Sequence, residues 1–310
     1  MSVLALDTSN YTTSVAVFDG HGGQNEGRLL QVRPGELGLR QSDALFQHVK
    51  QLPELFCRLE EQGALKDIQA VGASTRPRAV EGSYMPCFLA GASQGEALAR
   101  TLGVSFYEFS HQQGHLAAAA WSAGHLELLD APFLAWHLSG GTTELLLVEP
   151  EGVAVKAEII GGTSDISAGQ LIDRTGVMLG LPFPAGKGVD ALYDEADAAL
   201  KHKVKLNELT FSLSGMENKV KKLLEEGEKP GNIARFSLDT VINVVLRATQ
   251  EAQRRYPGLP VLCSGGVASN RQLRKALSQT CGAHFAEPRY STDNAMGTAI
   301  LTWRALEAAK

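Results

Sequence analysis

The sequence predicts an α/β protein built of two similar halves, and three observations support this class. Residues 3–6 and 14–18 are short apolar runs joined by a polar turn, which is the pattern of a β-hairpin. The same pattern returns at 133–138 and 145–148, around Ser-Gly-Gly-Thr-Thr. Elsewhere, stretches with helical spacing alternate with buried strands. We therefore expect duplicated sheets, each led by a hairpin; two unrelated α/β domains are the alternative.

The remaining elements are predicted from the spacing of apolar residues and from the turn residues between them. Helical spacing and apolar runs predict helices at 44–65, 94–102, 166–179 and 216–226, strands at 70–74, 153–160 and 261–263, and a helix that starts at Asn270. We place the domain boundary between the two hairpins, which gives an N-terminal domain of 1–125 and a C-terminal domain of 126–310. The last helix is expected to pack back on the first domain.

Composition limits the class of protein. With 310 residues, 44% of them hydrophobic and 20% charged, the chain can bury a large core and form two domains. The formal net charge of -5 provides no overall basic field, so contact with nucleic acid requires a local patch or a partner. Four scattered cysteines without a C-x-x-C pair are typical of a reducing compartment. No apolar run approaches the roughly 20 residues that span a bilayer, so we expect a cytoplasmic protein.

The sharpest local signal is Ser-His-Gln-Gln-Gly-His at 110–115. Ser110 is suited to cap a helix, which places His111 and His115 one turn apart on one face, where two imidazoles can share a metal ion. Two ordinary surface histidines are the alternative. A zinc peptidase needs a glutamate directly after the first histidine, and Gln112 cannot accept a proton, so protease activity is not expected. Asp293 precedes the final helix and is a candidate third ligand; alone, it would be an ordinary acid at a helix start.

Two glycine pairs are candidates for phosphate binding, because side chains there do not obstruct the backbone N–H groups. The first lies in Ser139-Gly140-Gly141-Thr142 and could equally be a simple tight turn. The second, Ser264-Gly265-Gly266, lies between a buried strand and a helix start, which favours a ligand site. Asp165 and Asp173 are expected two turns apart near a helix start, either to bind ribose hydroxyls or a cation, or as capping and solvated acids.

These motifs together resemble a known family, the tRNA threonylcarbamoyladenosine synthases (TsaD/YgjD), once described as O-sialoglycoprotein endopeptidases. The resemblance covers nearly the whole chain. It is carried, in order, by His111-x-x-x-His115, Ser139-Gly140-Gly141-Thr142, Ala168-Gly169-x-x-x-Asp173, Phe211-Ser212-x-Ser214-Gly215, Ser264-Gly265-Gly266-Val267-Ala268-x-Asn270 and Thr292-Asp293-Asn294.

The resemblance implies the two-domain fold of actin, hexokinase and the heat-shock chaperone ATPases. It implies an acyltransferase that moves a threonylcarbamoyl group from its adenylate to N6 of adenosine in tRNA. One divalent metal per chain, iron or zinc, is expected, and the adenylate is expected in a cleft between the halves. The implied metal ligands are His111, His115 and Asp293; the implied adenylate-binding residues are His137, Leu138, Ser139, Gly140, Gly141, Asp173, Gly186, Asp190 and Asn270.

The sequence departs from the family pattern in three places. The first turn usually carries an acidic pair, whereas here Asp7-Thr8-Ser9-Asn10 is followed by Tyr11-Thr12. A glycine-rich segment is replaced by a bulkier one containing Arg76 and Arg78, which we expect to favour an anionic ligand. The usual Pro-Gly-Gly-Pro reads Pro184-Ala185-Gly186-Lys187. These changes suggest a divergent paralogue.

Three interpretations of the function therefore stay open. The first is transfer to tRNA adenosine, with tRNA held with the help of partner subunits. The second is a transferase of the same fold acting on another acceptor. The third is a nucleotide-binding scaffold subunit without turnover, for which a heterodimer with a paralogue of the same fold would be expected. A small-molecule kinase is a more distant alternative, because nothing identifies a phosphoryl acceptor.

Overall fold

The computed structural model describes residues 1–9, 11–32, 39–201 and 203–310. By contacts the chain splits into two compact units. Unit 1 comprises 1–131, 149–157 and 289–310, and unit 2 comprises 132–148 and 158–288. Within the described parts of the chain, no helix combines the length and the apolar character needed to cross a membrane.

Unit 1 contains a five-stranded sheet in the order β3-β2-β1-β4-β5. The first three strands form antiparallel pairs, and β4 and β5 run parallel to β1. The predicted first hairpin is confirmed, with Val3 opposite Phe18 and Asp7 opposite Ser14. The strands are β1 Ser2–Thr8, β2 Thr12–Phe18, β3 Gly23–Leu29, β4 Ile68–Arg76 and β5 Ser105–Ser110.

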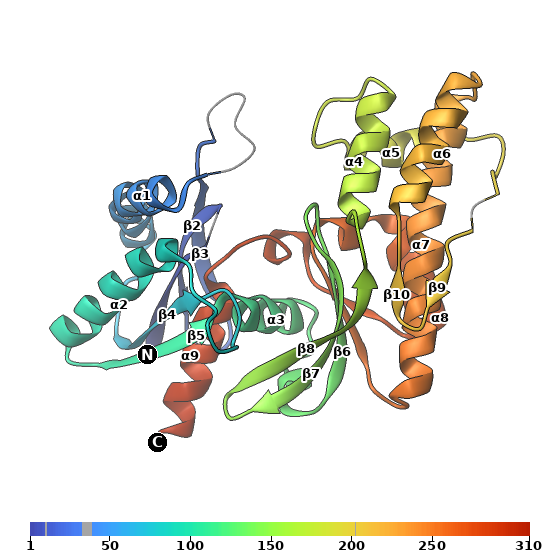
Figure 1. Cartoon of the computed structure of the whole chain (residues 1–310). Coiled ribbons are helices and arrows are strands. Elements are labelled where there is room, and N and C mark those ends of the chain that lie inside the picture. Colours follow the sequence, from blue (N-terminus) through green and yellow to red (C-terminus); the bar gives the residue numbers. More distant parts are fainter. Residues whose placement is uncertain (10, 33–38, 202) are drawn as a thin grey trace. The chain divides into compact units, whose positions relative to one another are not determined.

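Helices cover this sheet because side chains alternate along each strand between its two faces. Leu4 and Leu6 of β1 pack with Leu52, Leu55 and other apolar residues of α1 and α2. On the other side, α9 packs against β1, β4 and α3 (Figure 1). The helices of unit 1 are α1 Gln41–Glu61, α2 Leu89–Leu102, α3 His111–Ser122 and α9 Met296–Ala308. The last helix is therefore part of the same unit as the first strand.

Helices α3 and α9 approach each other unusually closely. A β-carbon at Gly297 of α9 would overlap the carbonyl oxygen of Gly114 in α3. A β-carbon at Gly114 would lie 2.9 Å from Oγ1 of Thr298, and that hydroxyl also lies 2.9 Å from Oγ of Ser74 in β4. The missing side chains let the two backbones touch, which places the start of α9 beside the first turns of α3.

Unit 2 contains most of a seven-stranded sheet in the order β12-β11-β6-β7-β8-β10-β9, whose β7–β8 turn, within 149–157, is counted with unit 1. The second predicted hairpin is confirmed, because β6 and β7 pair antiparallel with Phe133 opposite Val148. Strand β11 runs parallel to β6. The strands are β6 Phe133–Leu138, β7 Thr143–Glu151, β8 Ala154–Thr163, β9 Leu206–Asn207, β10 Thr210–Phe211, β11 Val261–Ser264 and β12 His284–Phe285.

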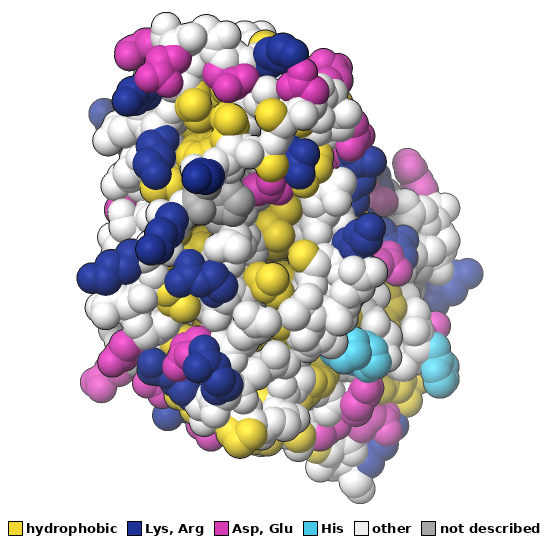
Figure 2. All heavy atoms as spheres, turned by 90° about the vertical axis from the view of Figure 1, so that its right-hand side faces the viewer, with side chains coloured by type: hydrophobic (Ala, Val, Ile, Leu, Met, Phe, Trp, Pro, Cys, Tyr) yellow, Lys and Arg dark blue, Asp and Glu magenta, His cyan; other side chains and the backbone are white. Residues whose placement is uncertain are grey.

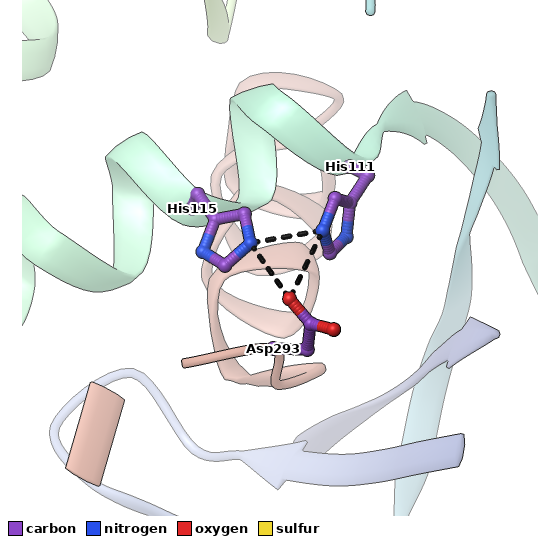
Figure 3. A group of neighbouring side chains, drawn as sticks. All are labelled: His111, His115 and Asp293. Atoms are coloured by element: carbon purple, nitrogen blue, oxygen red, sulfur yellow. Dashed lines mark hydrogen bonds and ion pairs between the residues drawn. The ribbon is translucent and has the colours of Figure 1, made fainter. Parts of the chain in front are cut away.

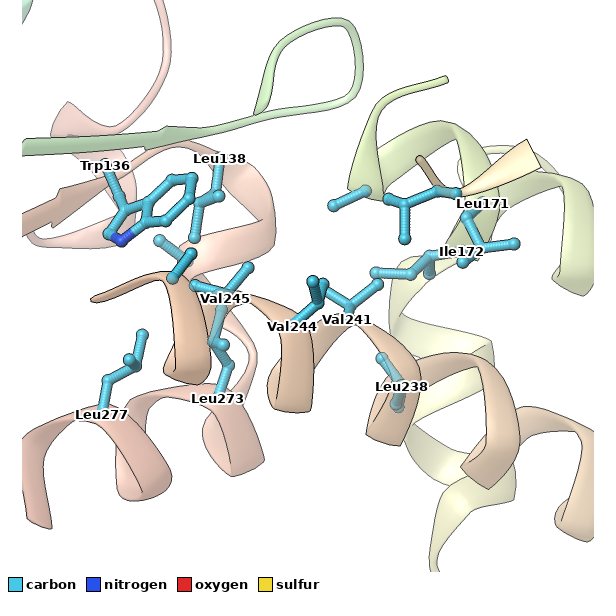
Figure 4. Packing of buried hydrophobic residues seen from close by; sticks show 14 of the residues in the cluster. Trp136, Leu138, Leu171, Ile172, Leu238, Val241, Val244, Val245, Leu273 and Leu277 are labelled. Carbon is cyan, nitrogen blue, oxygen red and sulfur yellow. The ribbon is translucent and has the colours of Figure 1, made fainter. Parts of the chain in front are cut away.

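The core of unit 2 forms around the long helix α7. Figure 4 shows Val241, Val244 and Val245 of α7 between Trp136 of β6 and residues of α4 and α8. Trp136 is fully buried, and its indole N–H donates to Oγ1 of Thr249 at 2.8 Å, so that its one polar group is satisfied. The helices are α4 Ala168–Met178, α5 Gly186–Tyr193, α6 Ser214–Glu225, α7 Pro230–Arg255 and α8 Arg271–Cys281.

The surface of unit 2 carries charges of both signs. Figure 2 shows Lys and Arg side chains gathered on part of one face, with Asp and Glu side chains close by. Charged side chains of unit 2 also form ion pairs, among them Arg174 with Glu217 at 2.6 Å and Arg235 with Asp239 at 3.3 Å. The face in this view is therefore not an uninterrupted basic surface.

One buried titratable group lies under the first hairpin. His48 of α1 is fully buried, and its Nδ1 lies 2.8 Å from Oγ1 of Thr13. The Thr13 hydroxyl donates to Oε1 of Gln51 at 2.7 Å, so Nδ1 of His48 must be the donor to Thr13. Among the described residues, Nε2 of His48 has no hydrogen-bond partner. A protonated His48 would therefore place a charge in the core that the negative charge of Asp7 offsets only in part.

We expect His48 to make the protein less stable in mild acid. Burial lowers the pKa of His48 from 6.5 to about 4, although the charge of Asp7 opposes this shift. Between these pH values the unfolded chain binds a proton at His48 that the folded protein does not bind. The free energy of unfolding is therefore undiminished by this group above pH 6.5 and falls as the pH is lowered toward 4. Urea denaturation should show that, between pH 7.0 and pH 4.5, the free energy of unfolding falls by about 2 kcal/mol more in the wild type than in His48→Gln.

The exposed His21 provides a matched control for this measurement. The variant His21→Gln should lose as much stability as the wild type over the same pH interval. An equal loss in the wild type and His48→Gln would show that the imidazole of His48 does not set the acid sensitivity.

Candidate metal centre and ligand cavity

The two histidines of the i,i+4 motif lie side by side at the start of α3. Ser110 caps this helix as predicted: its hydroxyl accepts the N–H of Gln113, and the Gln113 side chain accepts the N–H of Ser110. The cap fixes the first turn and thereby the direction of both imidazoles. The ring centroids of His111 and His115 are 4.3 Å apart.

Asp293 completes a cluster of three potential ligands, as Figure 3 shows. Nε2 of His111 and Nε2 of His115 are 2.9 Å apart, and Oδ1 of Asp293 lies 3.5 Å and 3.3 Å from these two atoms. Ligands held about 2.0–2.2 Å from one metal ion are themselves roughly 3 Å apart, so these separations fit a shared ion. The three side chains are 18%, 14% and 26% exposed, which leaves solvent access on one side. The sequence prediction of this ligand set is therefore compatible with the geometry.

A fourth residue, Asp7, supports the cluster from behind. Its carboxylate is almost fully buried at the end of β1, with Oδ2 at 2.8 Å from Nδ1 of His111 and Oδ1 accepting the N–H of Ser9 at 3.1 Å. A carboxylate on Nδ1 holds the proton there and directs the Nε2 lone pair toward the metal position. Spacing in the sequence did not reveal this contact, because Asp7 and His111 are 104 residues apart.

The charges in the cluster are strongly coupled. Burial alone would lower the pKa of His111, but the negative charge of Asp7 and hydrogen bonds to Asp293 and Asp7 outweigh it and raise the pKa to about 10 in the metal-free protein. Burial would raise the pKa of Asp293, yet hydrogen bonds to His111 and His115 hold it well below its ordinary value. Without a metal ion, a proton on His111 compensates the two carboxylates; a divalent cation can replace that proton.

The arginine-containing segment lies beside this cluster. Arg76 at the end of β4 is opposite Ser110 in the ladder with β5, and the carbonyl oxygen of Pro77 accepts the N–H of Gln112 at 3.0 Å. The segment therefore contacts the first turn of α3, from which His111 projects. Asn10, which belongs to the other divergent segment, lies outside the described residues.

Five of the predicted adenylate-binding residues line one cavity of about 580 Å³ in unit 2: Gly140, Asp173, Gly186, Asp190 and Asn270. A β-carbon at Gly140, Gly186 or the neighbouring Gly266 would meet no atom within 4 Å, so the backbone is open to the cavity. The structure brings together, from distant parts of the chain, the first glycine turn, α4, α5 and the second glycine turn.

The other four predicted residues lie next to this wall or behind it. Leu138 is fully buried in the hydrophobic core, where its side chain packs beneath the turn. Ser139 closes the tight turn, because its N–H donates to the carbonyl oxygen of Thr142 and its hydroxyl accepts the N–H of Thr142. His137 is paired with Ser264 across the β6–β11 ladder. Gly141 follows Gly140 in the turn, and a β-carbon there would also meet open space.

Asp165 and Asp173 hold different loops. Helix α4 begins at Ala168, so Asp165 lies before it, and its carboxylate accepts hydrogen bonds from the Ser212 hydroxyl and the Leu213 N–H. These bonds hold the pKa of Asp165 far below its ordinary value, against the effect of burial. Oδ1 of Asp173 accepts the N–H of Ala185 at 2.8 Å and thereby fixes the segment that leads into α5. Asp165 is a structural anchor, whereas Asp173 also faces the cavity.

We expect the purified protein to carry about one divalent metal ion per chain, and His111→Ala to remove most of it. The substitution deletes one of three ligands and leaves Asp7 buried without its partner. Elemental analysis of both proteins after gel filtration measures the ratio. His21→Ala, at an exposed site, should keep the full metal content; equal content in wild type and His111→Ala would reject the assignment.

The substitution Asp7→Asn should weaken metal binding by about 10- to 100-fold without removing a ligand. An amide at this position can offer an N–H to Nδ1, which would move the imidazole proton to Nε2 and block the metal position. Competition titration with a chromophoric chelator measures the affinity. Asp19→Asn, in an exposed turn, is the control. Unchanged affinity in Asp7→Asn would mean that this contact serves packing alone.

The chain is similar to proteins of one known family. The family model described as TsaD, tRNA N6-adenosine threonylcarbamoyltransferase, matches residues 38–300. Proteins with that name from Thermus thermophilus and Brucella anthropi are 32% and 30% identical, over 98% and 100% of this chain and 93% and 90% of their own lengths.

Solved structures at lower identity support the fold alone. Component A of (R)-2-hydroxyglutaryl-CoA dehydratase from Acidaminococcus fermentans is similar over the full length of both chains, with a TM-score of 0.56 and 15% identity. The match to full-length HypF covers 98% of this chain and 47% of the HypF chain, with a TM-score of 0.61 and 14% identity. The predicted α/β fold of the actin and hexokinase class is confirmed. With the sequence matches, these findings show that the chain belongs to the tRNA N6-adenosine threonylcarbamoyltransferase family.

Proposed function

We propose that this protein is a metal-dependent transferase that moves a threonylcarbamoyl group from its adenylate to N6 of adenosine in tRNA. The observation that carries this proposal is the convergence of His111, His115 and Asp293 with Asp7 behind His111. A chain that only served as a scaffold would have no need of three ligands and a buried carboxylate that orients one of them.

The proposed reaction is an acyl transfer. A bond forms between N6 of adenosine and the carbamoyl carbon, and the bond between that carbon and the phosphate oxygen breaks. AMP leaves with the bonding electrons, and N6 loses one proton. A bound divalent metal would act as a Lewis acid toward a carbamate or phosphate oxygen on which negative charge develops.

The residues of this chain would contribute by binding and orientation. Three protein ligands leave further metal positions open for an oxygen of the substrate, as in catalytic metal sites generally. Two imidazoles and one carboxylate suit both iron and zinc. Asp7 would keep the Nδ1 proton of His111 in place during the reaction, so that Nε2 stays available as a ligand.

The adenylate is proposed to bind in the cavity of unit 2. Gly140, Gly186 and Gly266 expose backbone to this space, which suits the close approach of a phosphate or ribose. Asn270 caps α8 by accepting the N–H groups of Gln272 and Leu273, while its amide N–H donates to Asp190. This network would hold Asp190 in a fixed orientation toward the ligand.

Recruitment of tRNA is proposed to depend on partner subunits. The formal net charge is -5, and the face in Figure 2 mixes both signs of charge. Binding to the phosphate backbone rests mainly on Lys and Arg, so a chain of this composition gains affinity by sharing the RNA with a more basic partner.

We expect modified nucleoside to form only when the metal ligands are intact. Unmodified tRNA would be incubated with threonine, bicarbonate, ATP, an adenylate-forming enzyme, the partner subunits of a relative and this protein; nucleosides would then be measured by mass spectrometry. Asp293→Ala should reduce the product at least about 100-fold, because it removes a ligand.

The control Glu60→Ala replaces an exposed acid of α1 and should retain full activity. Equal product with wild type and Asp293→Ala would refute metal dependence. Absence of product with the metal-loaded wild type would refute transfer to tRNA and favour another acceptor or a scaffold role.

A further inference from the structure

The wall of the cavity in unit 2 includes a cationic side chain that pairs with no other described residue. Its wall includes two acids, Asp173 and Asp190, and one lysine, Lys187. Asp173 accepts the N–H of Ala185, and Asp190 accepts from Asn270 at 2.9 Å and pairs with Arg271 at 3.3 Å. Both acids therefore have partners. Within the described parts of the chain, Lys187 forms no ion pair or hydrogen bond through its side chain.

Lys187 lies where an anion would be held. It is the second residue of α5, and the N–H groups in the first turn of a helix have no partners within that helix. The preceding residue, Gly186, also lines the cavity and has open space in front of its α-carbon. The start of α5 and the Lys187 side chain thus line the same cavity, and Asp173 fixes the segment that leads to them.

Position 187 is also one at which this sequence departs from the family pattern. The family motif ends in proline where this chain has Lys187, and a proline could offer neither an ammonium group nor a backbone N–H. The change adds one positive charge to the wall of the cavity.

We propose that Lys187 binds the phosphate of the adenine nucleotide and gives this cavity its preference for a phosphorylated ligand over the free nucleoside. The inference rests on the proposed function for the identity of the ligand. A phosphate group suits this site better than a carboxylate, because it has more oxygen atoms that can accept hydrogen bonds from several donors at once. Lys187 is a binding residue for the ligand and takes no part in bond breaking.

The test compares nucleotide and nucleoside in matched variants. Calorimetry would measure the dissociation constants of AMP, ATP and adenosine for wild type, Lys187→Gln, Lys187→Arg and Lys275→Gln. Lys275 is exposed on α8 and does not line the cavity, so its substitution removes the same net charge elsewhere in unit 2. Circular dichroism would confirm that each variant is folded.

We expect Lys187→Gln to weaken AMP and ATP binding by about 10-fold and to leave adenosine binding unchanged. This loss of affinity is at the small end of the range for a hydrogen bond to a charged group, because the Lys187 side chain is exposed to solvent. Lys187→Arg should keep most of the affinity, and Lys275→Gln all of it. The affinity of the wild type for AMP should also fall more steeply with added salt than that of Lys187→Gln, because one ion pair is missing in the variant.

Equal AMP affinity in wild type and Lys187→Gln would overturn the inference, as would a wild type that binds adenosine as tightly as AMP. These results do not depend on tRNA modification. A protein that binds AMP through Lys187 but forms no modified nucleoside would support the inference and refute the proposed reaction. A wild type that binds none of the three ligands would refute both.

Discussion

The candidate metal centre depends on the close crossing of α3 and α9. The candidate ligands His111 and His115 are on α3, and Asp293 precedes α9 by a few residues. The two helices can lie this close because neither Gly114 nor Gly297 carries a side chain at the contact. Alanine at Gly297 would force the helices apart by overlap with a backbone oxygen, which cannot rotate away as a side chain can. Asp293 would then move away from the imidazoles, whose positions are fixed by the Ser110 cap.

The same contact sets the environment of the charges. Packing of α9 against β1 and β4 closes the back of the cluster and buries Asp7. A buried carboxylate is costly without a cation or hydrogen bonds, and here His111, Ser9 and Ser74 supply them. The first turn lacks the acidic pair that the family pattern carries, yet its remaining acid, Asp7, contacts the candidate ligand His111. This arrangement favours an enzyme over a scaffold that has lost its chemistry.

The cavity of unit 2 is built differently, because glycines from several segments line it together with apolar side chains such as Ile172 and Leu238 and a few charged side chains. The core around α7 positions the ends of β6 and β11, and the glycine turns at those ends face the cavity while Leu138 and Trp136 remain buried behind them. Since the glycines contribute no charge, the charge of the wall comes from Asp173, Lys187 and Asp190. Two of these, Asp173 and Asp190, also fix the wall itself through hydrogen bonds. Among the described residues of the wall, Lys187 is therefore the charged side chain that can pair with a bound ligand.

Much of the local structure followed from the sequence alone, because it depends on neighbours along the chain. Short apolar runs joined by polar turns predicted both hairpins, the sequence around Ser110 predicted the helix cap, and the i,i+4 spacing predicted the pair of imidazoles. The position of Asp293 before the final helix made it a candidate third ligand, and the resemblance added Gly186, Asp190 and Asn270 to the candidate binding residues; the structure places Asp293 beside both imidazoles and these three residues in one cavity. Other features depend on contacts between residues far apart in the sequence. The support of His111 by Asp7, the anchoring of a distant loop by Asp165 and the burial of His48 result from which strands and helices pack together. No spacing rule connects residues 104 positions apart; only the packed sheet and the glycine contact between α3 and α9 bring Asp7, His111 and Asp293 to one place.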